Sequence, residues 1–337
     1  MKWIKTPDKQ SIKPIYTQIK DDFLTAIENG QLKVGDNIPS INKLCNEFEL
    51  APGTVIHAFE ELREMGVLSS KQGKGFFIAS TDVDQKTKIF LLFDKMTSFK
   101  EILYESFREE FDEETDIQVF FHHYDLKRFE KLIRENLGRF SHYVLMPHLQ
   151  GNIQKTIARI PEKKIVFIDN LPGDIITAAK AVYQDFFNDI YNALGEKTDE
   201  LRKYNSLNLS LSQSLFQFVP DGIRKGFSAF CETNNLDFEI IKSITEQNLT
   251  RNELYIIFDD SELVKTLKMI EKRNWKLKDD IGIISFDDSP MKELLAGGIS
   301  VLSTDFVLMG KTAAEMVKGN AEGQIANPFG LIYRNSF

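Results

Sequence analysis

Residues 66–78 read Gly66-Val67-Leu68-Ser69-Ser70-Lys71-Gln72-Gly73-Lys74-Gly75-Phe76-Phe77-Ile78. Two short apolar runs flank a centre of glycine and lysine. This pattern is typical of a tight β-hairpin, because glycine reaches the positive backbone dihedrals that such a turn requires. The hairpin follows a stretch with helical patterns, and this order is that of a winged helix-turn-helix. The start of the chain, residues 1–79, is therefore predicted to be an α+β winged helix-turn-helix domain.

Three helices are expected ahead of the hairpin. Apolar residues repeat at helical spacing over 15–28, and Gly30 follows as a C-terminal cap. Pro39-Ser40 begins a second helix that the Ser40 hydroxyl can cap. A turn over 49–53 leads into a third helix, whose core face is fixed by Val55, Ala58, Phe59, Leu62 and Met65.

The residues expected to contact DNA follow from this arrangement. A helix-turn-helix reads bases through the first exposed residues of its third helix, here Thr54 and His57. Phosphate contacts are expected at the start of the second helix and in the hairpin, from Ser40, Asn42, Lys43, Lys71, Gln72, Gly73 and Lys74. The alternative for each of them is an ordinary solvated surface residue.

The charge of the chain is compatible with DNA binding once it is divided. The formal net charge is −8, yet residues 1–80 hold 10 basic and 10 acidic side chains, and residues 81–337 hold 32 and 40. All the excess acid therefore lies outside the expected head. A neutral head with lysines on its hairpin predicts modest affinity per monomer, and hence a dimer.

Two further observations limit the class of protein. Cys45 and Cys231 lie apart among apolar neighbours, which is typical of buried free thiols. The N-terminus has no apolar run and the chain has no uncharged stretch of membrane-spanning length, so we expect a cytoplasmic protein without a membrane partner.

After a polar connector, residues 80–87, short apolar runs alternate with amphipathic helical stretches. The expected strands are 88–93, 117–121, 142–146, 165–168, 178–182, 205–209, 238–242, 254–258 and 281–286. The expected helices are 99–111, 126–137, 153–160, 185–194, 221–234, 261–274 and 306–317. Such alternation is typical of parallel sheets with helices on both faces, and the strands are too many for one sheet. We expect a two-lobed α/β domain over residues 88–337.

Acidic residues follow four of the expected strands. They are Asp94, Asp169, Asp259-Asp260 and Asp287-Asp288. Ligands bind beyond the carboxyl ends of the strands in such lobes, and an ionised carboxylate accepts strong hydrogen bonds from neighbouring hydroxyl groups. One acid at a strand end is usually a turn former or a helix cap, but four that converge indicate a site for a polyol.

The head resembles the DNA-binding domain of the GntR family. The resemblance covers residues 12–79 and is carried by 39–44, by 50–62 and by the hairpin. The chain departs from the family pattern at Asn42, at Ala51-Pro52-Gly53 and at Ile56, which stand where the family commonly has arginine or Ser-Arg. These departures affect the expected target sequence more than DNA binding itself.

Residues 88–337 resemble the periplasmic-binding-protein-like (type I), sugar-sensing domain of the LacI family. The motifs are Ile281-Gly282-Ile283-Ile284-Ser285-Phe286-Asp287-Asp288, the segment 303–310, Gly226-Phe227 and the segment 331–336. The resemblance implies effector contacts from Asp169, Asp259 and Asp287, with Phe99 lining the ligand, and Asp94 joins them as a strand-end acid. The family's ligand-gripping arginine stands where this chain has Ile223, with Arg224 as the replacement candidate.

This combination is similar to the arabinose-repressor group of bacterial regulators. It implies a homodimer that binds operator DNA and releases it when a pentose or a 6-deoxyhexose, such as arabinose or fucose, closes the lobes. Lobe one is expected at about 88–172 plus 303–320, and lobe two at about 173–302 plus 321–337. The crossings between them are then near Pro172, Ser303 and Glu322.

Other readings remain open at this point. The same regulator with a nucleoside, a phosphorylated compound or another non-sugar effector fits the pattern, because Phe99 and Phe186 would stack on a sugar or on a base. An enzyme is not expected, since no P-loop, no Gly-x-Ser-x-Gly and no HExxH motif occurs. No cofactor or metal is expected either, because neighbours in a strand, such as His122-His123, point to opposite faces.

Overall fold

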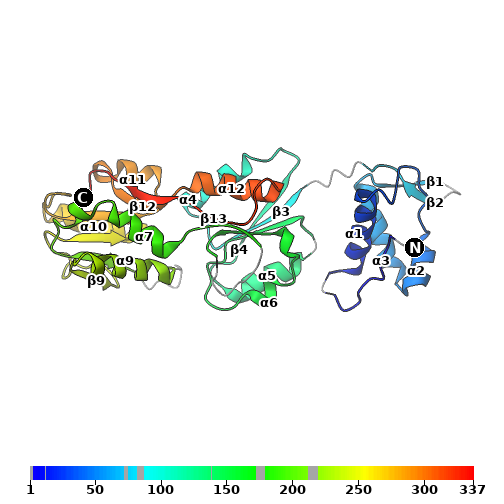
Figure 1. Ribbon diagram of the computed structural model, residues 1–337, viewed down its shortest axis with the longest axis horizontal. Coiled ribbons are helices and arrows are strands. Elements are labelled where there is room, and N and C mark those ends of the chain that lie inside the picture. The colour runs from blue at the N-terminus through cyan, green and yellow to red at the C-terminus, as the bar shows by residue number, and fades with distance from the viewer. Residues whose placement is uncertain are drawn as a thin grey trace. The chain divides into compact units, whose positions relative to one another are not determined.

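The computed structural model describes residues 3–11, 13–71, 75–81, 87–137, 139–171, 179–211 and 219–337. The chain divides into two compact units, of which the first contains residues 1–88 and two short later segments, and the second contains the rest. Figure 1 labels their elements. Within the described ranges, no helix has the length and apolar character needed to cross a bilayer.

The described part of the N-terminal unit contains three helices and a hairpin. Its elements are α1 (Ile15–Glu28), α2 (Ile41–Phe48), α3 (Pro52–Glu64), β1 (Leu68–Lys71) and β2 (Gly75–Ile78). The two strands pair antiparallel, with Leu68 opposite Ile78. Helix α3 packs against both α1 and α2. The expected winged helix-turn-helix is thus present.

The core of the N-terminal unit is formed by the apolar faces of these helices. Phe23 of α1 and Phe59 of α3 are fully buried and meet edge to face, with ring centroids 5.7 Å apart. Phe76 of β2 packs edge to face on Phe59 at 5.0 Å, which joins the hairpin to the helices. The helical periodicity of the sequence therefore leads directly to one small core.

In the C-terminal unit, the described residues form two six-stranded sheets. The first sheet has the order β13-β7-β6-β5-β3-β4, and the second has the order β14-β12-β11-β10-β8-β9. The first is built from β3 (Lys88–Phe93), β4 (Asp116–Phe121), β5 (His142–Leu145), β6 (Ile165–Asp169), β7 (Lys180–Tyr183) and β13 (Gln324–Ala326). The second is built from β8 (Leu207–Ser210), β9 (Phe238–Ile241), β10 (Leu254–Ile257), β11 (Gly282–Phe286), β12 (Ser300–Thr304) and β14 (Phe329–Ile332).

Helices cover these sheets as the alternating pattern predicted. They are α4 (Ser98–Arg108), α5 (Leu126–Asn136), α6 (Gln154–Ile157), α7 (Phe186–Gly195), α8 (Thr198–Leu201), α9 (Asp221–Thr233), α10 (Asp260–Lys272), α11 (Pro290–Leu294) and α12 (Phe306–Lys318), with short 3-10 turns η1 (Glu162–Lys164) and η2 (Leu295–Gly297). Along β10, Leu254 and Ile256 pack in the core that contains α7 and α9, whereas Tyr255 and Ile257 pack in the core that contains α10. Both faces of this strand are therefore buried, as its continuous apolar sequence requires.

Two glycines let neighbouring helices approach closely. A Cβ atom at Gly226 of α9 would lie 2.4 Å from the Phe187 carbonyl oxygen of α7, and one at Gly310 of α12 would lie 2.5 Å from the Leu103 carbonyl oxygen of α4. The pairs α7 with α9 and α4 with α12 are in extensive contact, and α4 and α12 lie side by side in Figure 1.

The sheets correct the expected lobe boundaries. The crossing was placed near Pro172, which lies outside the described residues, but β7 pairs in parallel with β6 and so belongs to the first sheet. The first crossing therefore follows Tyr183. Strand β13 pairs with β7, so the last crossing lies between Ala326 and Phe329, not near Glu322. Both errors arise because hydrophobic periodicity detects a strand but not its partner.

Candidate functional sites

The start of α3 exposes part of the surface expected to read DNA bases. Thr54 is partly buried and His57 is exposed. The His57 ring packs on Tyr16 of α1 with centroids 4.3 Å apart, and its Nε2 atom lies 3.5 Å from Glu61 Oε1. Lys20 pairs with the same glutamate. These contacts hold the imidazole in a defined position on the helix surface.

The start of α2 exposes three of the expected phosphate contacts, Ser40, Asn42 and Lys43. The Ser40 hydroxyl accepts a hydrogen bond from the Lys43 backbone N–H at 3.2 Å, so it caps the helix. Backbone N–H groups at a capped helix start suit an anion. Of the expected hairpin contacts, Gln72, Gly73, Lys74 and the side chain of Lys71 lie outside the described residues.

A cavity of about 250 Å³ in the C-terminal unit brings together the strand-end acids. Asp94 follows β3, Asp169 ends β6, Asp287 follows β11, and Asp259 lies between β10 and α10. All four line the cavity, as does Phe99. Carboxylates therefore enter it from both sheets. Ligand sites in proteins commonly measure about 300–1,000 Å³. This cavity is slightly smaller than that range, so it suits a small ligand.

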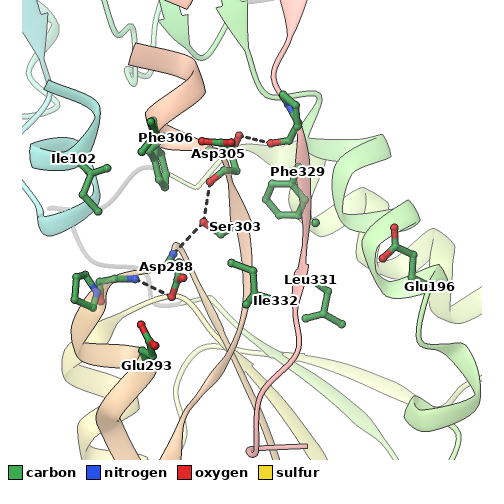
Figure 2. Close-up of a pocket in the computed structure, with 16 residues that line it drawn as sticks. Ile102, Glu196, Asp288, Glu293, Ser303, Asp305, Phe306, Phe329, Leu331 and Ile332 are labelled. Carbon is green, nitrogen blue, oxygen red and sulfur yellow. Dashed lines mark hydrogen bonds between the residues drawn. The ribbon is translucent and has the colours of Figure 1, made fainter. Parts of the chain in front are cut away.

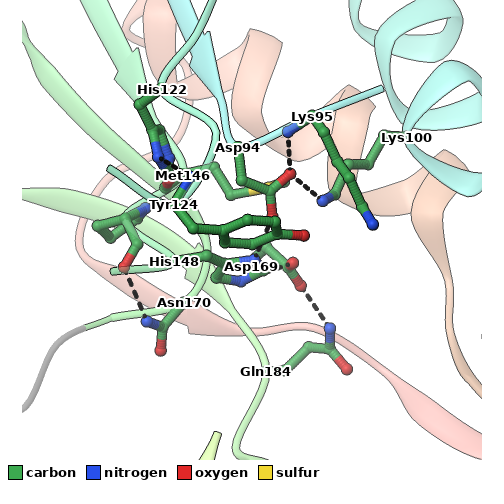
Figure 3. Close-up of polar contacts among 11 residues, drawn as sticks. Asp94, Lys95, Lys100, His122, Tyr124, Met146, His148, Asp169, Asn170 and Gln184 are labelled. Carbon is green, nitrogen blue, oxygen red and sulfur yellow. Dashed lines mark hydrogen bonds and ion pairs between the residues drawn. The ribbon is translucent and has the colours of Figure 1, made fainter. Parts of the chain in front are cut away.

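The first-sheet side of this cavity holds a bridged pair of carboxylates. The Nδ1 atom of His148 lies 2.9 Å from Asp94 Oδ2, and its Nε2 atom lies 3.1 Å from Asp169 Oδ2. Lys100 of α4 also pairs with Asp94, and the Gln184 amide donates to Asp169. Figure 3 shows His148 between the two acids. All five side chains are buried.

The charges in this group stabilise one another. Burial opposes ionisation of both Asp94 and Asp169, but their hydrogen bonds and ion pairs with His148 outweigh it and hold both pKa values below the ordinary range. Burial alone would lower the pKa of His148. The contacts with Asp169 and Asp94 reverse this and raise its pKa to about 9. At neutral pH the group is two carboxylates bridged by an imidazolium.

The second-sheet side differs, because Asp287 has no such bridge. Burial raises the pKa of Asp287 to about 7, with Lys292 opposing this shift and the charge of Asp169 adding to it. The Lys292 ammonium lies 2.8 Å from Asp260 Oδ1 and donates to the Asp287 carbonyl oxygen at 2.8 Å. The surroundings of Asp287 therefore favour the neutral form of its carboxyl group.

Two of the cavity acids have a strained backbone. Asp169 has φ 68° and Asp287 has φ 57°, both in the left-handed region that non-glycine residues rarely adopt. Such strain gathers at ligand sites, where the surrounding structure enforces it. The two residues occupy corresponding places, at the carboxyl ends of a strand in each sheet, so the strain supports a shared role.

The structure corrects one expected effector contact. Arg224 does not line the cavity, because its guanidinium is exposed and lies 2.8 Å from Asp221 Oδ1 on the same helix. Ile223 lines the cavity in its place. Successive residues of a helix are rotated by about 100° about its axis. An arginine at position 224 instead of position 223 therefore points away from the cavity.

Several cavity residues were missed by the sequence analysis, namely Lys100, Tyr124, His148, Gln184 and Lys292. Three of them carried a usable signal: Gln184 directly follows β7, and Tyr124 and His148 closely follow β4 and β5, so the strand-end rule applied to every strand would have included them. Lys100 and Lys292 lie in helices. Tyr124 has its pKa raised by burial and by Asp94, so its hydroxyl stays protonated.

A second cavity, of about 560 Å³, lies beside the turn that carries Asp287 (Figure 2). Asp288 lines it, and the backbone N–H of Asp288 donates to Ser303 Oγ at 3.0 Å. The Asp288 carboxylate accepts two hydrogen bonds from Arg334, at 2.9 and 2.8 Å. The turn is thus fixed to β12, directly before the chain crosses between the sheets.

Family models match both units. The model of the bacterial regulatory proteins of the gntR family matches residues 15–78, and that of the periplasmic binding protein-like domain matches residues 216–336. Together they confirm the expected fold class, a winged helix-turn-helix head followed by two α/β lobes.

Bacterial transcription regulators match a part of this chain. The HTH-type transcriptional repressor YtrA of Bacillus subtilis is 33% identical over 96 residues, which cover 28% of this chain and 70% of YtrA. The regulator YhcF of the same species is 33% identical over 21% of this chain and 58% of its own length. The arabinose metabolism transcriptional repressor of Geobacillus stearothermophilus is 36% identical over 23% of each chain. The chain thus spans under two thirds of YhcF and under a quarter of the arabinose repressor.

Solved structures share the fold of the C-terminal unit. The lac repressor dimer, bound to operator and an anti-inducer, has a TM-score of 0.60 at 13% identity and covers 75% of this chain and 94% of its own. A periplasmic binding protein/LacI transcriptional regulator of Alkaliphilus metalliredigens, in complex with D-xylulofuranose, has a TM-score of 0.57 at 15% identity and covers 74% and 98%. Identities this low show the fold alone.

Proposed function

The chain belongs to the GntR family of bacterial regulatory proteins, and from this premise we propose that it is a repressor whose release from operator DNA is controlled by a small sugar. The family is one of transcription regulators rather than enzymes. The effector domain is of the periplasmic-binding type.

One observation carries the proposal. Carboxylates from the strand ends of both sheets surround a cavity of about 250 Å³, and two of them have a strained backbone. Ionised carboxylates accept strong hydrogen bonds from vicinal hydroxyl groups. Phe99 and Phe186 add flat apolar surfaces against which a sugar ring can stack. A pentose or a 6-deoxyhexose, such as arabinose or fucose, fits this chemistry.

The cavity offers a way for a ligand to control DNA binding, because residues from both sheets line it. A ligand held by Asp169 of the first sheet and Asp287 beside the second favours the arrangement in which both reach it. Such a ligand shifts the equilibrium between open and closed lobes. Residues 80–87 connect the effector domain to the head and would carry this change to it.

We further propose that the protein acts as a homodimer in the cytoplasm, where operator DNA lies. A head with 10 basic and 10 acidic residues in its first 80 gains little long-range attraction to phosphates. Two linked heads compensate, because the second binds at a high effective concentration. The lac repressor, which shares the fold of the effector domain, was solved as a dimer on its operator.

Thermal unfolding of the purified full chain against pentoses, deoxyhexoses, hexoses and nucleosides tests the effector. A specific ligand at about 100 times its Kd adds about 2.7 kcal/mol of stability. DNA duplexes selected from a random pool by the wild-type protein then serve for fluorescence anisotropy with and without that ligand. Release of the DNA by a single sugar supports the proposal. Stabilisation by a nucleoside alone would instead indicate that the aromatic cavity walls stack on a nucleobase.

A further inference from the structure

The side chain of His148 joins Asp94 to Asp169, and the proposed function does not use it. The imidazole of His148 lies between the two carboxylates, at 2.9 Å from one and 3.1 Å from the other. Its side chain is nearly buried. Two acids from different strands are thereby held at a fixed separation.

The charges of this group balance. Asp94 and Asp169 supply two negative charges, and His148 and Lys100 supply two positive ones. Burying charges is tolerated when they are paired and hydrogen-bonded, which is the case here. A cationic ligand would give this buried group a net positive charge, and an anionic ligand would give it a net negative charge. A hydroxyl group donates to a carboxylate oxygen without changing the charge.

We infer that His148 is a specificity-determining residue, which compensates the carboxylate pair so that the cavity selects an uncharged polyol over amino sugars and sugar phosphates. This inference rests on the proposed function, because it assumes that the cavity binds a sugar. The cavity then recognises the charge of its ligand, and His148 determines this preference.

The protonation state of His148 agrees with this role. Its pKa is raised to about 9 by Asp169 and Asp94, so it carries its positive charge throughout the neutral range. The amide of Gln184 donates to Asp169 on the far side and is uncharged. Lys100 contacts Asp94. Removal of either cation leaves the group with one net negative charge, which an ammonium group of a ligand would neutralise.

The experiment measures binding of three ligand classes to the full chain by calorimetry. Neutral aldopentoses, deoxyhexoses and hexoses, the amino sugars D-glucosamine and D-galactosamine, and the 6-phosphates of D-glucose and D-galactose are compared at about pH 6.5, below the ordinary pKa of such an amine. The variants are His148→Gln and Lys100→Met, which each remove one positive charge from different positions. His142→Gln is the matched control, because His142 begins β5, the strand that precedes His148, and burial lowers its pKa to about 4, so it is uncharged.

Wild-type protein is expected to bind a neutral sugar and to discriminate against its amino and phosphate analogues. Both charge-removing variants are expected to change the ratio of amino-sugar to neutral-sugar affinity by about tenfold or more in favour of the amine, since a charge pair at about 4 Å interacts strongly in a partly buried site. The control variant is expected to keep the wild-type ratio. If His148→Gln does not fold, Lys100→Met makes the same test.

Two results would overturn the inference. Neutral-sugar binding with an unchanged ratio in both variants would show that the bridge only holds the acids in place, and the proposed function would stand. Wild-type preference for an amino sugar or a sugar phosphate would contradict the charge rule while leaving a sugar-class effector. Binding of none of the sugars by wild-type protein would instead refute the proposed sugar effector itself.

Discussion

Replacing Asp287 with Asn is expected to stabilise the unliganded protein near neutral pH while it weakens the binding of sugar. Burial raises the pKa of this carboxyl group from 3.8 to about 7 in the folded protein. The folded state therefore binds the proton more tightly than the unfolded chain does. As pH rises from about 4 to about 7, the free energy of unfolding must fall, and above that range this contribution stays constant.

The size of the effect follows from the shift. A change of about 3 pKa units corresponds to about 4 kcal/mol, because each unit is worth about 1.4 kcal/mol. Asp287 is partly exposed, so solvent screens part of this penalty and about 2 kcal/mol is the value that we expect. Asparagine has nearly the same shape but does not ionise. The variant should gain this amount at about pH 7.5 and nothing at about pH 4.

Urea unfolding at these two pH values measures the difference. The chain has two tryptophans, Trp3 in the N-terminal unit and Trp275 in the core of the second sheet. In a Trp3→Phe background the fluorescence reports on the lobe that carries Asp287. Sugar binding is measured on the same preparations, and we expect it to weaken by about 10 to 100-fold, because a hydrogen bond to a charged group contributes about 1.5–3 kcal/mol.

The reasoning would be refuted by either of two results. Equal stability of the variant and the parent at both pH values would show that Asp287 does not carry a desolvated charge. Stabilisation with an unchanged affinity for sugar would show that the carboxylate is buried for some other purpose and that the ligand binds elsewhere.

Three further predictions concern other parts of the molecule. Replacing Lys71 and Lys74 with Ala should weaken operator binding and reduce the slope of log affinity against log salt by about 1.8, measured by anisotropy, and an unchanged slope would exclude the hairpin as a phosphate contact. Gly226→Ala should destabilise the C-terminal unit by about 1–3 kcal/mol in urea unfolding, because the new methyl group overlaps the backbone of α7. Arg224→Ala should leave sugar affinity within about twofold in calorimetry, since the guanidinium pairs with Asp221 in solvent; a large loss would mean that it turns inward on binding.

The candidate effector site shows how far strand-end reasoning reaches. Asp94, Asp169, Asp259 and Asp287 were selected because each follows an apolar run, and all four line one cavity. The rule works because parallel strands end at a common edge, so residues far apart in sequence gather there. It says nothing of helix residues such as Lys100, whose reach into the cavity depends on how α4 packs.

Arg224 shows where the transfer of a family's site residues to this sequence fails. Sequence alone offered it as the replacement for an arginine clamp, because it is the next residue along the chain. The helix places Ile223 in the cavity and Arg224 in solvent. One residue on a helix is a rotation of about 100°, so a shift of one position changes the environment completely.

Local patterns by themselves determined most elements of this protein: the helices of the head, the glycine-rich hairpin, the alternation of strands and helices, and the acids at the strand ends. These features follow from side-chain periodicity and turn chemistry, which act over a few residues. Local patterns did not indicate the strands β12, β13 and β14. Only the tertiary structure decided that β7 and β13 join the first sheet, and that His148 bridges Asp94 and Asp169. Strand pairing and buried ion pairs depend on which distant segments meet, and that choice is made by the packing of the whole domain.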